Sequence, residues 1–119
     1  MVYDPRNIFA QIIKGDIKAE KLYEDDKVIA IQDINPASPI HILVLPKGEY
    51  VDLADFVGKE SPENIAHYFK TVDKIAQANG AQEYRIVSNK GTAAGQSVFH
   101  FHTHILGGMD NINLVDQNL

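Results

Sequence analysis

The chain has 119 residues, which suits one domain built around a single two-layer core. With 16 acidic and 11 basic side chains its formal charge is −5, and the absence of a Lys/Arg run argues against nucleic acid or an anionic membrane as a partner. The sequence has no cysteine, which excludes disulfides, thiolate catalysis and cysteine-based zinc sites, and nowhere do about 18 uncharged apolar residues run together. We therefore expect a folded, soluble protein of the cytoplasm.

The first half of the chain predicts one short helix followed by three strands. Asn7 can cap a helix whose apolar residues recur at helical spacing until Gly15 ends it. Residues 21–24 and 28–32 have the composition of two strands around a polar turn, and a loop with two prolines follows the second strand. Aliphatic and β-branched residues then predict a buried strand over 41–45.

The main helix is predicted in the second half. Ser61 is a suitable N-cap ahead of Pro62, and the helical pattern runs to Asn79 before Gly80 stops it. The apolar residues of this pattern are Ile65, Phe69, Val72, Ile75 and Ala76. Their spacing places them on one face, which we expect to cover a sheet.

Two further strands are predicted over 84–88 and 97–106, with a glycine-containing loop between them. The tail 109–119 shows no clear period and is left irregular. This order of elements favours an α+β domain with an antiparallel sheet. No linker, repeat or low-complexity tract divides the chain into smaller units.

Three of the five histidines, His100, His102 and His104, alternate with other residues inside the last predicted strand. Side chains of a strand alternate between its faces, so the three imidazoles are expected to project from one face, and Phe101, Thr103 and Ile105 from the other. The solvated face of an edge strand is the structural alternative, and it suits a lone histidine better than three in alternation. The pattern therefore favours a functional site.

A metal site is one function that the pattern leaves open. At about 3.3 Å per residue, the Cα atoms of His100 and His104 would lie roughly 13 Å apart, which is too far for both to bind one tetrahedral zinc. Two adjacent histidines with His41 or Asp33 as a third ligand would still suffice.

Nucleophilic catalysis by histidine is the other function. A neutral imidazole has an in-plane lone pair and a pKa near neutrality, so at pH 7 it can attack phosphorus while a neighbouring histidine carries a proton. The loop 89–97 supplies amide donors, a hydroxyl group, and glycines that allow backbone N–H groups to approach an anion. Its position directly before the histidines favours a phosphate site there.

The histidines belong to a longer pattern. The stretch 95–108, GQSVFHFHTHILGG, closely resembles the histidine triad nucleotide-binding proteins, a branch of the histidine triad (HIT) superfamily. The resemblance extends upstream to Asn7-Ile8-Phe9, Tyr23-Glu24-Asp25-Asp26, Asp33-Ile34-Asn35-Pro36 and His41-Ile42-Leu43-Val44-Leu45-Pro46-Lys47. It therefore covers nearly the whole chain except the tail.

The resemblance implies a single HIT domain over 1–119, with a five-stranded antiparallel sheet that pairs with a second subunit into a ten-stranded sheet in a homodimer. It also implies hydrolysis of purine nucleoside phosphoramidates, such as adenosine 5′-phosphoramidate, and of aminoacyl adenylates, without a metal or other cofactor. An AMP-like purine nucleotide is then the expected ligand.

The same resemblance implies roles for individual residues. The middle histidine, His102, would be the nucleophile that forms a nucleotidyl-imidazole intermediate, while His104 and Ser97 bind the α-phosphate. His41 and His100 would complete the set of catalytic histidines. The remaining nucleotide-binding residues would be Asp33 at the ribose hydroxyls, Asn89 near the phosphate, Gly95 and Gln96 in the loop, and Ile8, Phe9, Ile12, Ile34 and Leu43 around the base. An ordinary core position is an equal alternative for each of these apolar residues.

Other functions stay open at this point. Within the superfamily, a dinucleoside polyphosphate hydrolase is the alternative, although the short chain and the Gly107-Gly108 ending favour the phosphoramidate branch. Outside catalysis, the domain would be a purine-nucleotide binding module with incidental turnover, or a metal-binding regulator. Thr103 departs from the apolar residue of the family pattern, which bears on packing on the face away from the rings. The tail lacks an aromatic residue, so the leaving group is not implied.

Overall fold

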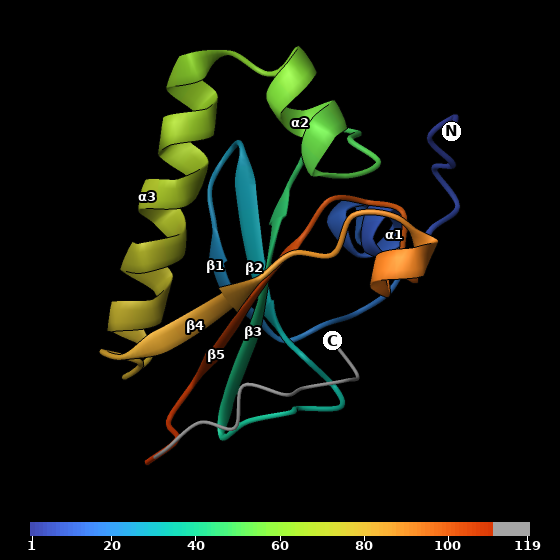
Figure 1. Ribbon diagram of the computed structural model, residues 1–119. Helices are drawn as coiled ribbons and strands as arrows, with labels where there is room; N and C mark the ends of the chain where they lie inside the picture. The colour runs from blue at the N-terminus through green and yellow to red at the C-terminus, as the bar shows by residue number, and fades with distance from the viewer. Residues whose placement is uncertain (111–119) are drawn as a thin grey trace.

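Five antiparallel strands form one sheet in the order β1-β2-β3-β5-β4 (Figure 1). This computed structural model describes residues 1–110. The elements in chain order are α1 (Ile8–Lys14), β1 (Lys21–Glu24), β2 (Val28–Gln32), β3 (Ile40–Pro46), α2 (Leu53–Lys59), α3 (Pro62–Ala78), β4 (Tyr84–Val87), the 3₁₀ turn η1 (Thr92–Ala94) and β5 (Thr103–Gly107). The predicted α+β class with a five-stranded antiparallel sheet is therefore confirmed.

Helices α1 and α3 begin at the capping residues that the sequence predicts. The Asn7 side chain accepts a hydrogen bond from the Ala10 N–H at 2.9 Å, and Gly15 ends α1 with a φ of 87°. Such a left-handed conformation is unfavourable for residues with a Cβ, which is why glycine suits this position. The Ser61 hydroxyl accepts from the Asn64 N–H at 3.1 Å and caps α3 in the same way.

Helix α2 is absent from the sequence prediction. The Asp52 carboxylate caps it by accepting from the Asp55 N–H at 2.9 Å. Phe56 is its one buried residue, so the seven-residue helix has no apolar period that a sequence pattern could show. The helix nevertheless closes the core, because Phe56 stacks on Phe101 with ring centroids 4.8 Å apart.

The two faces of the sheet carry separate cores, with α3 on one side and α1 on the other (Figure 1). Successive residues of a strand point to opposite faces, so β2 and β3 contribute to both cores. The α3-side core contains Val28, Ala30, Ile42, Val44, Phe56, Tyr68, Val72, Ile75, Ala76, Ala81, Phe101 and Ile105. The α1-side core contains Phe9, Ile12, Ile29, Ile31, Leu43 and Leu45.

The sheet-facing side of α3 differs from the prediction at one residue. Phe69 was expected to face the sheet but is 36% exposed, and the adjacent Tyr68 is buried instead. The Tyr68 hydroxyl is 2.8 Å from the Val44 carbonyl oxygen and 2.8 Å from the Thr103 hydroxyl oxygen. A buried phenol needs such partners, so these contacts explain how a tyrosine occupies the core.

The last strand is shorter than predicted. β5 begins at Thr103 rather than at residue 97, so His104 is the one member of the three triad histidines (His100, His102 and His104) that lies in the sheet. The neighbouring strand β4 ends where Val87 pairs with His104, which leaves the preceding segment without a ladder partner on that side. That segment bonds to the loop after β3 instead, where the Phe101 N–H donates to the Tyr50 carbonyl at 2.7 Å.

Two expectations concern the tail and the membrane. Of the irregular tail predicted over 109–119, Met109 and Asp110 are described and lie in neither a helix nor a strand, and 111–119 lies outside the described residues. Among residues 1–110, no helix is long and apolar enough to cross a membrane.

Candidate active site

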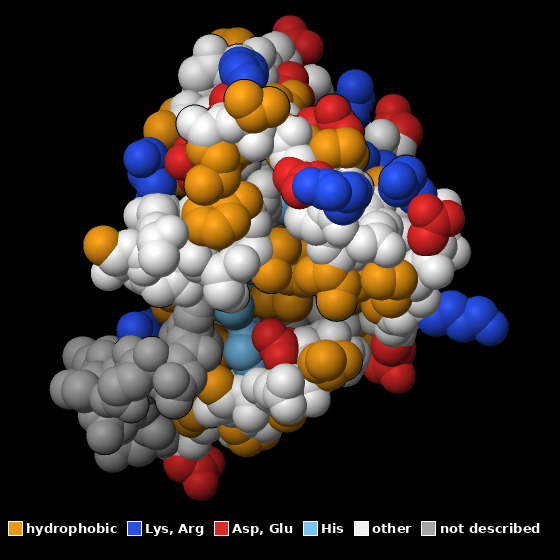
Figure 2. Space-filling view, turned by 90° about the vertical axis from the view of Figure 1, so that its right-hand side faces the viewer, with side chains coloured by type: hydrophobic (Ala, Val, Ile, Leu, Met, Phe, Trp, Pro, Cys, Tyr) orange, Lys and Arg blue, Asp and Glu red, His pale blue; other side chains and the backbone are white. Residues whose placement is uncertain are grey.

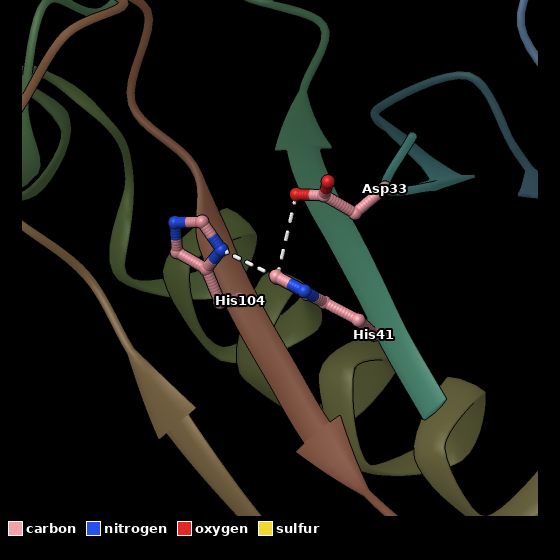
Figure 3. A group of neighbouring side chains, drawn as sticks. All are labelled: Asp33, His41 and His104. Carbon is pink, nitrogen blue, oxygen red and sulfur yellow. Dashed lines mark hydrogen bonds and ion pairs between the residues drawn. The ribbon is translucent and has the colours of Figure 1, made fainter. Parts of the chain in front are cut away.

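Asp33, His41 and His104 meet on the α1 side of the sheet (Figure 3). His41 lies on β3 and His104 on the neighbouring strand β5, and the His41 Nε2 and His104 Nδ1 atoms are 2.9 Å apart. Asp33 directly follows β2, and its Oδ2 atom lies 3.4 Å from the same His41 Nε2. Both rings are buried, so these contacts form in a region of low dielectric constant.

Backbone partners determine which ring nitrogens of His41 and His104 carry protons. The Ala37 N–H donates to His41 Nδ1 at 2.9 Å, so in the neutral ring the proton of His41 is on Nε2. His41 Nε2–H can then donate to His104 Nδ1, which places the His104 proton on its Nε2. That Nε2 atom is buried and has no hydrogen-bond partner among the described residues. An unpartnered buried donor indicates a place for a ligand acceptor.

His102 has the opposite arrangement. Its Nδ1 lies 2.8 Å from the His100 carbonyl oxygen, and because a carbonyl can only accept, Nδ1 carries the proton. The lone pair of the neutral ring is therefore on Nε2. Phe9 of α1 packs edge-on against His102 with ring centroids 4.9 Å apart. The ring centroid of His104, which lies in β5, is 5.1 Å from that of His102. The site thus pairs a lone pair on one ring with a free donor on the next.

The predicted alternation of side chains persists although the strand is short. Phe101 and Ile105 belong to the α3-side core. The one proton of the Tyr68 phenol goes to the Val44 carbonyl, so the Thr103 hydroxyl donates to the Tyr68 oxygen at 2.8 Å. The hydroxyl of Thr103 therefore serves as a partner for a buried phenol on the face away from the rings. This contact gives a polar side chain at position 103 a partner inside the core.

Burial lowers the pKa of all three triad histidines. It lowers the pKa of His100 to about 4, against a smaller opposing effect of the Pro46 carbonyl. It lowers the pKa of His104 to about 3, helped by the nearby His102 and His41 rings. The pKa of His102 is also lowered by burial, while its bond to the His100 carbonyl and the Asp33 charge raise it. At pH 7 the three rings are neutral, as a nucleophile and a hydrogen-bond donor require.

Asp33 serves both the turn and the histidines. Its Oδ1 accepts from the Asn35 N–H at 2.7 Å, as expected of an aspartate that holds a turn. Its Oδ2 faces His41, and its backbone N–H donates to the His41 carbonyl at 3.1 Å. The carboxylate retains acceptor capacity, since two oxygens offer about four lone-pair positions. The predicted contact with ribose hydroxyls stays a prediction.

The side chain of Gln96 holds the loop before the triad in place through hydrogen bonds to the backbone. The buried Gln96 amide accepts from the Gly91 N–H at 2.8 Å and donates to the carbonyls of Val51 at 2.7 Å and Val98 at 3.1 Å. Its side chain is therefore committed to shaping the loop. Ser97, by contrast, is exposed and lines a groove of about 430 Å³ beside α1.

Two other loop residues lie together. A Cβ placed on Gly95, whose φ is 97°, would come 3.5 Å from the Asn89 side-chain nitrogen. The side chain of Asn89 therefore lies against the backbone of Gly95, and a residue with a Cβ there would be strained by this φ. The structure thus brings both predicted residues into the loop that precedes the triad.

The predicted base-binding residues divide into two groups. Phe9, Ile12 and Leu43 are buried in the α1-side core, whereas Ile8 is 43% exposed and Ile34 is 87% exposed. Figure 2 shows histidine side chains in a hollow beside an acidic side chain, with hydrophobic side chains gathered along one rim. Exposed apolar side chains at such a site are available to a ligand, whereas the buried residues Phe9, Ile12 and Leu43 form the core beneath it.

The donors of Asp33, His41 and His104 also suit a metal ion by chemical type, since their ligand atoms lie within 4.8 Å of one another. A metal, however, binds the lone pair of a ring nitrogen. The nitrogen of His41 that faces the other two residues is Nε2. Because Nδ1 accepts from the Ala37 N–H, the ring proton is on Nε2, which leaves no lone pair there for a metal. The hydrogen-bonded arrangement of these residues therefore does not fit a bound metal.

Sequence reasoning missed the groups that orient the rings. The Ala37 amide and the Pro46 carbonyl are backbone atoms, to which a side-chain pattern gives no clue. Tyr3 was also missed: its hydroxyl oxygen lies 2.6 Å from His100 Nδ1. Nothing in the local sequence around this tyrosine signals a contact across the length of the chain.

Comparison with known proteins agrees with the fold described above. The HIT domain family matches residues 14–111. The chain belongs to this family. An uncharacterised HIT-like protein of Rickettsia prowazekii is 44% identical over 119 residues, covering 98% of this chain and 99% of the relative. A 14 kDa zinc-binding protein of Zea mays is 41% identical over 107 residues, covering 88% of this chain and 84% of the relative. Among solved structures, a HIT family hydrolase from Clostridium thermocellum has a TM-score of 0.80 at 37% identity, covering 92% of this chain and 97% of that chain.

We expect the buried histidines of this HIT domain to remain neutral far into the acid range. In an NMR titration the ring signals of His100 should shift with a midpoint at about 4 rather than 6.5. The unfolded chain binds protons at these rings first, so the free energy of unfolding should fall as the pH drops from 6.5 towards about 4. A midpoint near 6.5 in the folded protein would contradict the inferred burial of the site.

Proposed function

We propose that this HIT domain is a nucleotide hydrolase of the histidine triad nucleotide-binding branch, acting on purine nucleoside phosphoramidates and aminoacyl adenylates through a nucleotidyl-His102 intermediate. The observation that supports it is that two neighbouring rings offer different groups: His102 has a lone pair on Nε2, and His104 has a buried Nε2–H without a hydrogen-bond partner among the described residues. A phosphoryl group between the two rings would meet a nucleophile and an oxygen-binding donor together. The related solved structure that is named a hydrolase agrees with this class.

In the first step, His102 Nε2 donates its lone pair to phosphorus and a P–N bond forms. The bond between phosphorus and the leaving amine breaks, its electron pair stays on the amine nitrogen, and that nitrogen takes a proton from water. With an aminoacyl adenylate, the P–O bond to the carboxylate breaks instead. His104 Nε2–H and the Ser97 hydroxyl would donate to the phosphoryl oxygens, where negative charge develops.

In the second step, water attacks phosphorus and the bond to His102 Nε2 breaks. The electron pair returns to the ring and the nucleoside monophosphate leaves. The attacking water gives up a proton to solvent, which neutralises the hydroxide left when the amine took its proton in the first step. Throughout both steps His102 keeps its Nδ1 proton, which the His100 carbonyl accepts at 2.8 Å. That carbonyl therefore also stabilises the positive charge that the ring carries in the intermediate.

The nucleoside end of the substrate would lie beside Asp33. The exposed Ile34 and Ile8 offer apolar surface to a purine ring, and the Asp33 carboxylate offers acceptors to the ribose hydroxyls. A binding module would use the same contacts without turnover, and a dinucleoside polyphosphate hydrolase would use the same nucleophile on a different leaving group. Turnover of a phosphoramidate with a fluorogenic amine, compared with a dinucleoside polyphosphate, separates the three.

Replacing the nucleophile provides the direct test. In His102→Ala we expect kcat to fall by roughly 10³-fold or more, while AMP binding is nearly retained, because no other described ring offers a lone pair at this position. Mass spectrometry of protein quenched without acid should show a nucleotidyl adduct on the wild type and none on the variant. His67→Ala, at a half-exposed histidine of α3, is the matched control and should keep full activity. Appreciable turnover by His102→Ala would refute the assignment.

Chelation separates catalysis by histidine from the metal-binding alternative. The name of the Zea mays relative favours that alternative, whereas the hydrogen-bonded arrangement of Asp33, His41 and His104 does not. If the His102 mechanism holds, EDTA leaves kcat/KM unchanged. A loss on chelation that zinc restores would replace the proposed mechanism with a metal-dependent one.

The role of Asp33 can be measured through the substrate sugar. If it binds ribose, the wild type should discriminate against a 2′-deoxy substrate by about 1.5 to 3 kcal/mol, the range for a hydrogen bond to a charged group. Asp33→Ala should remove most of that discrimination, whatever it does to both rates through His41. The measurement is kcat/KM for both sugars on both proteins. Asp26→Ala, at an exposed aspartate of the first hairpin, is the control. An unchanged ratio in Asp33→Ala would exclude Asp33 from the ribose site.

We further propose a homodimer in which two β4 strands pair and extend the sheet to ten strands. β4 is an edge strand, and its Ile86 is 47% exposed on the face that it shares with Tyr84. Tyr84 donates to Asp73 of α3, one helical turn from the exposed Phe69, so apolar side chains flank this edge. Sedimentation equilibrium should give twice the chain mass of 13.2 kDa, and Ile86→Lys should shift it towards one chain. A monomer at all concentrations would refute the pairing.

A further inference from the structure

Tyr3 brings the start of the chain to the first triad histidine. Its hydroxyl oxygen lies 2.6 Å from His100 Nδ1, although the two residues are 97 positions apart in sequence. The rings meet edge to face with centroids 5.6 Å apart, and His100 is completely buried beneath this contact. The family resemblance assigns no role to this tyrosine.

The direction of this hydrogen bond follows from the other side of the ring. His100 Nε2 lies 2.7 Å from the Pro46 carbonyl oxygen, which can only accept, so Nε2 carries the proton of the neutral ring. Nδ1 then holds a lone pair, and the Tyr3 hydroxyl must donate to it. Burial raises the pKa of Tyr3 above that of a free tyrosine, so the hydroxyl keeps its proton at neutral pH.

The backbone at His100 needs a support that the sheet does not supply. β5 begins at Thr103, so the segment before it has no strand ladder to hold it. The Phe101 N–H bond to the Tyr50 carbonyl is one attachment, and the His100 ring, held at both nitrogens, is another. The carbonyl of this same residue accepts the Nδ1 proton of His102. The position of residue 100 therefore bears directly on the orientation of the nucleophile.

We propose that Tyr3 is a positioning residue: its hydroxyl donates to His100 Nδ1 and holds the ring in place, and thereby holds the backbone carbonyl that orients His102. This inference rests on the proposed function for its effect on rate. The hydrogen bond and the ring contact of Tyr3 are both with His100, so it acts through that ring.

Tyr3→Phe removes the hydroxyl and keeps the ring. We expect kcat to fall by about tenfold, the factor that corresponds to the loss of one net hydrogen bond, with KM changed by less than about twofold. Tyr23→Phe is the matched control. Tyr23 lies on the edge strand β1, and the substitution removes a hydroxyl that donates to Asp25 at 2.7 Å. It should keep the wild-type kcat. A purely structural role for Tyr3 would lower the melting temperature and leave kcat unchanged, which would overturn the proposal.

Histidine tautomers give a readout that does not depend on turnover. Long-range ¹H–¹⁵N correlation spectra of the wild type should show His100 neutral with its proton on Nε2, and His102 neutral with its proton on Nδ1. In Tyr3→Phe the Pro46 carbonyl still keeps the His100 proton on Nε2, but the His100 Nδ1 signal should shift because its hydrogen bond is lost, and the His102 ring signals should shift with it. Unchanged ring signals of His100 and His102 in Tyr3→Phe would overturn the proposal, whatever the rate. A wild type that turns over no phosphoramidate but shows these shifts would refute the proposed function and leave the positioning contact established.

Discussion

The hydrogen bond from the Ala37 N–H to His41 Nδ1 is the contact on which the candidate site depends. A backbone N–H has no alternative to donating, so this bond places the His41 proton on Nε2 and, across 2.9 Å, the His104 proton on its own Nε2. At His102 a carbonyl does the reverse and leaves the lone pair on Nε2. Backbone groups do not titrate, so these two partners keep their roles as donor and acceptor at every pH, whereas a carboxylate partner would not.

These backbone groups are available because the strands end where they do. Ala37 precedes β3, Pro46 is the last residue of β3, and His100 lies before the start of β5. Within a ladder, carbonyls and N–H groups are largely taken up by the neighbouring strands. Had the last strand begun at residue 97, as the sequence predicts, the His100 carbonyl would compete for a ladder partner. The shorter β5 leaves that carbonyl to His102.

The sequence predicts those features that depend on local residues. Caps at Asn7 and Ser61, the strand composition and the spacing of the triad are visible in it. The family resemblance points to Asp33 and His41, which the structure places beside His104. It does not predict where β5 begins, because that depends on how far β4 extends beside it. It also does not predict α2, with a single buried residue, or the contact of Tyr3, which only the folded chain brings to His100.

Burial of the histidines opposes stability and supports chemistry through the same physical effect. An unpartnered buried donor such as His104 Nε2–H costs the folded state about 1 to 3 kcal/mol, and a nearby protein acceptor would recover that stability. In the proposed function, such an acceptor would also occupy the place of a phosphoryl oxygen. The apolar surroundings, with Phe9 against His102, lower the pKa of the rings and keep the proposed nucleophile neutral at pH 7. The cost in stability is therefore tied to the features on which the proposed reaction depends, and we expect a variant that satisfied His104 within the protein to be more stable and less able to bind phosphate.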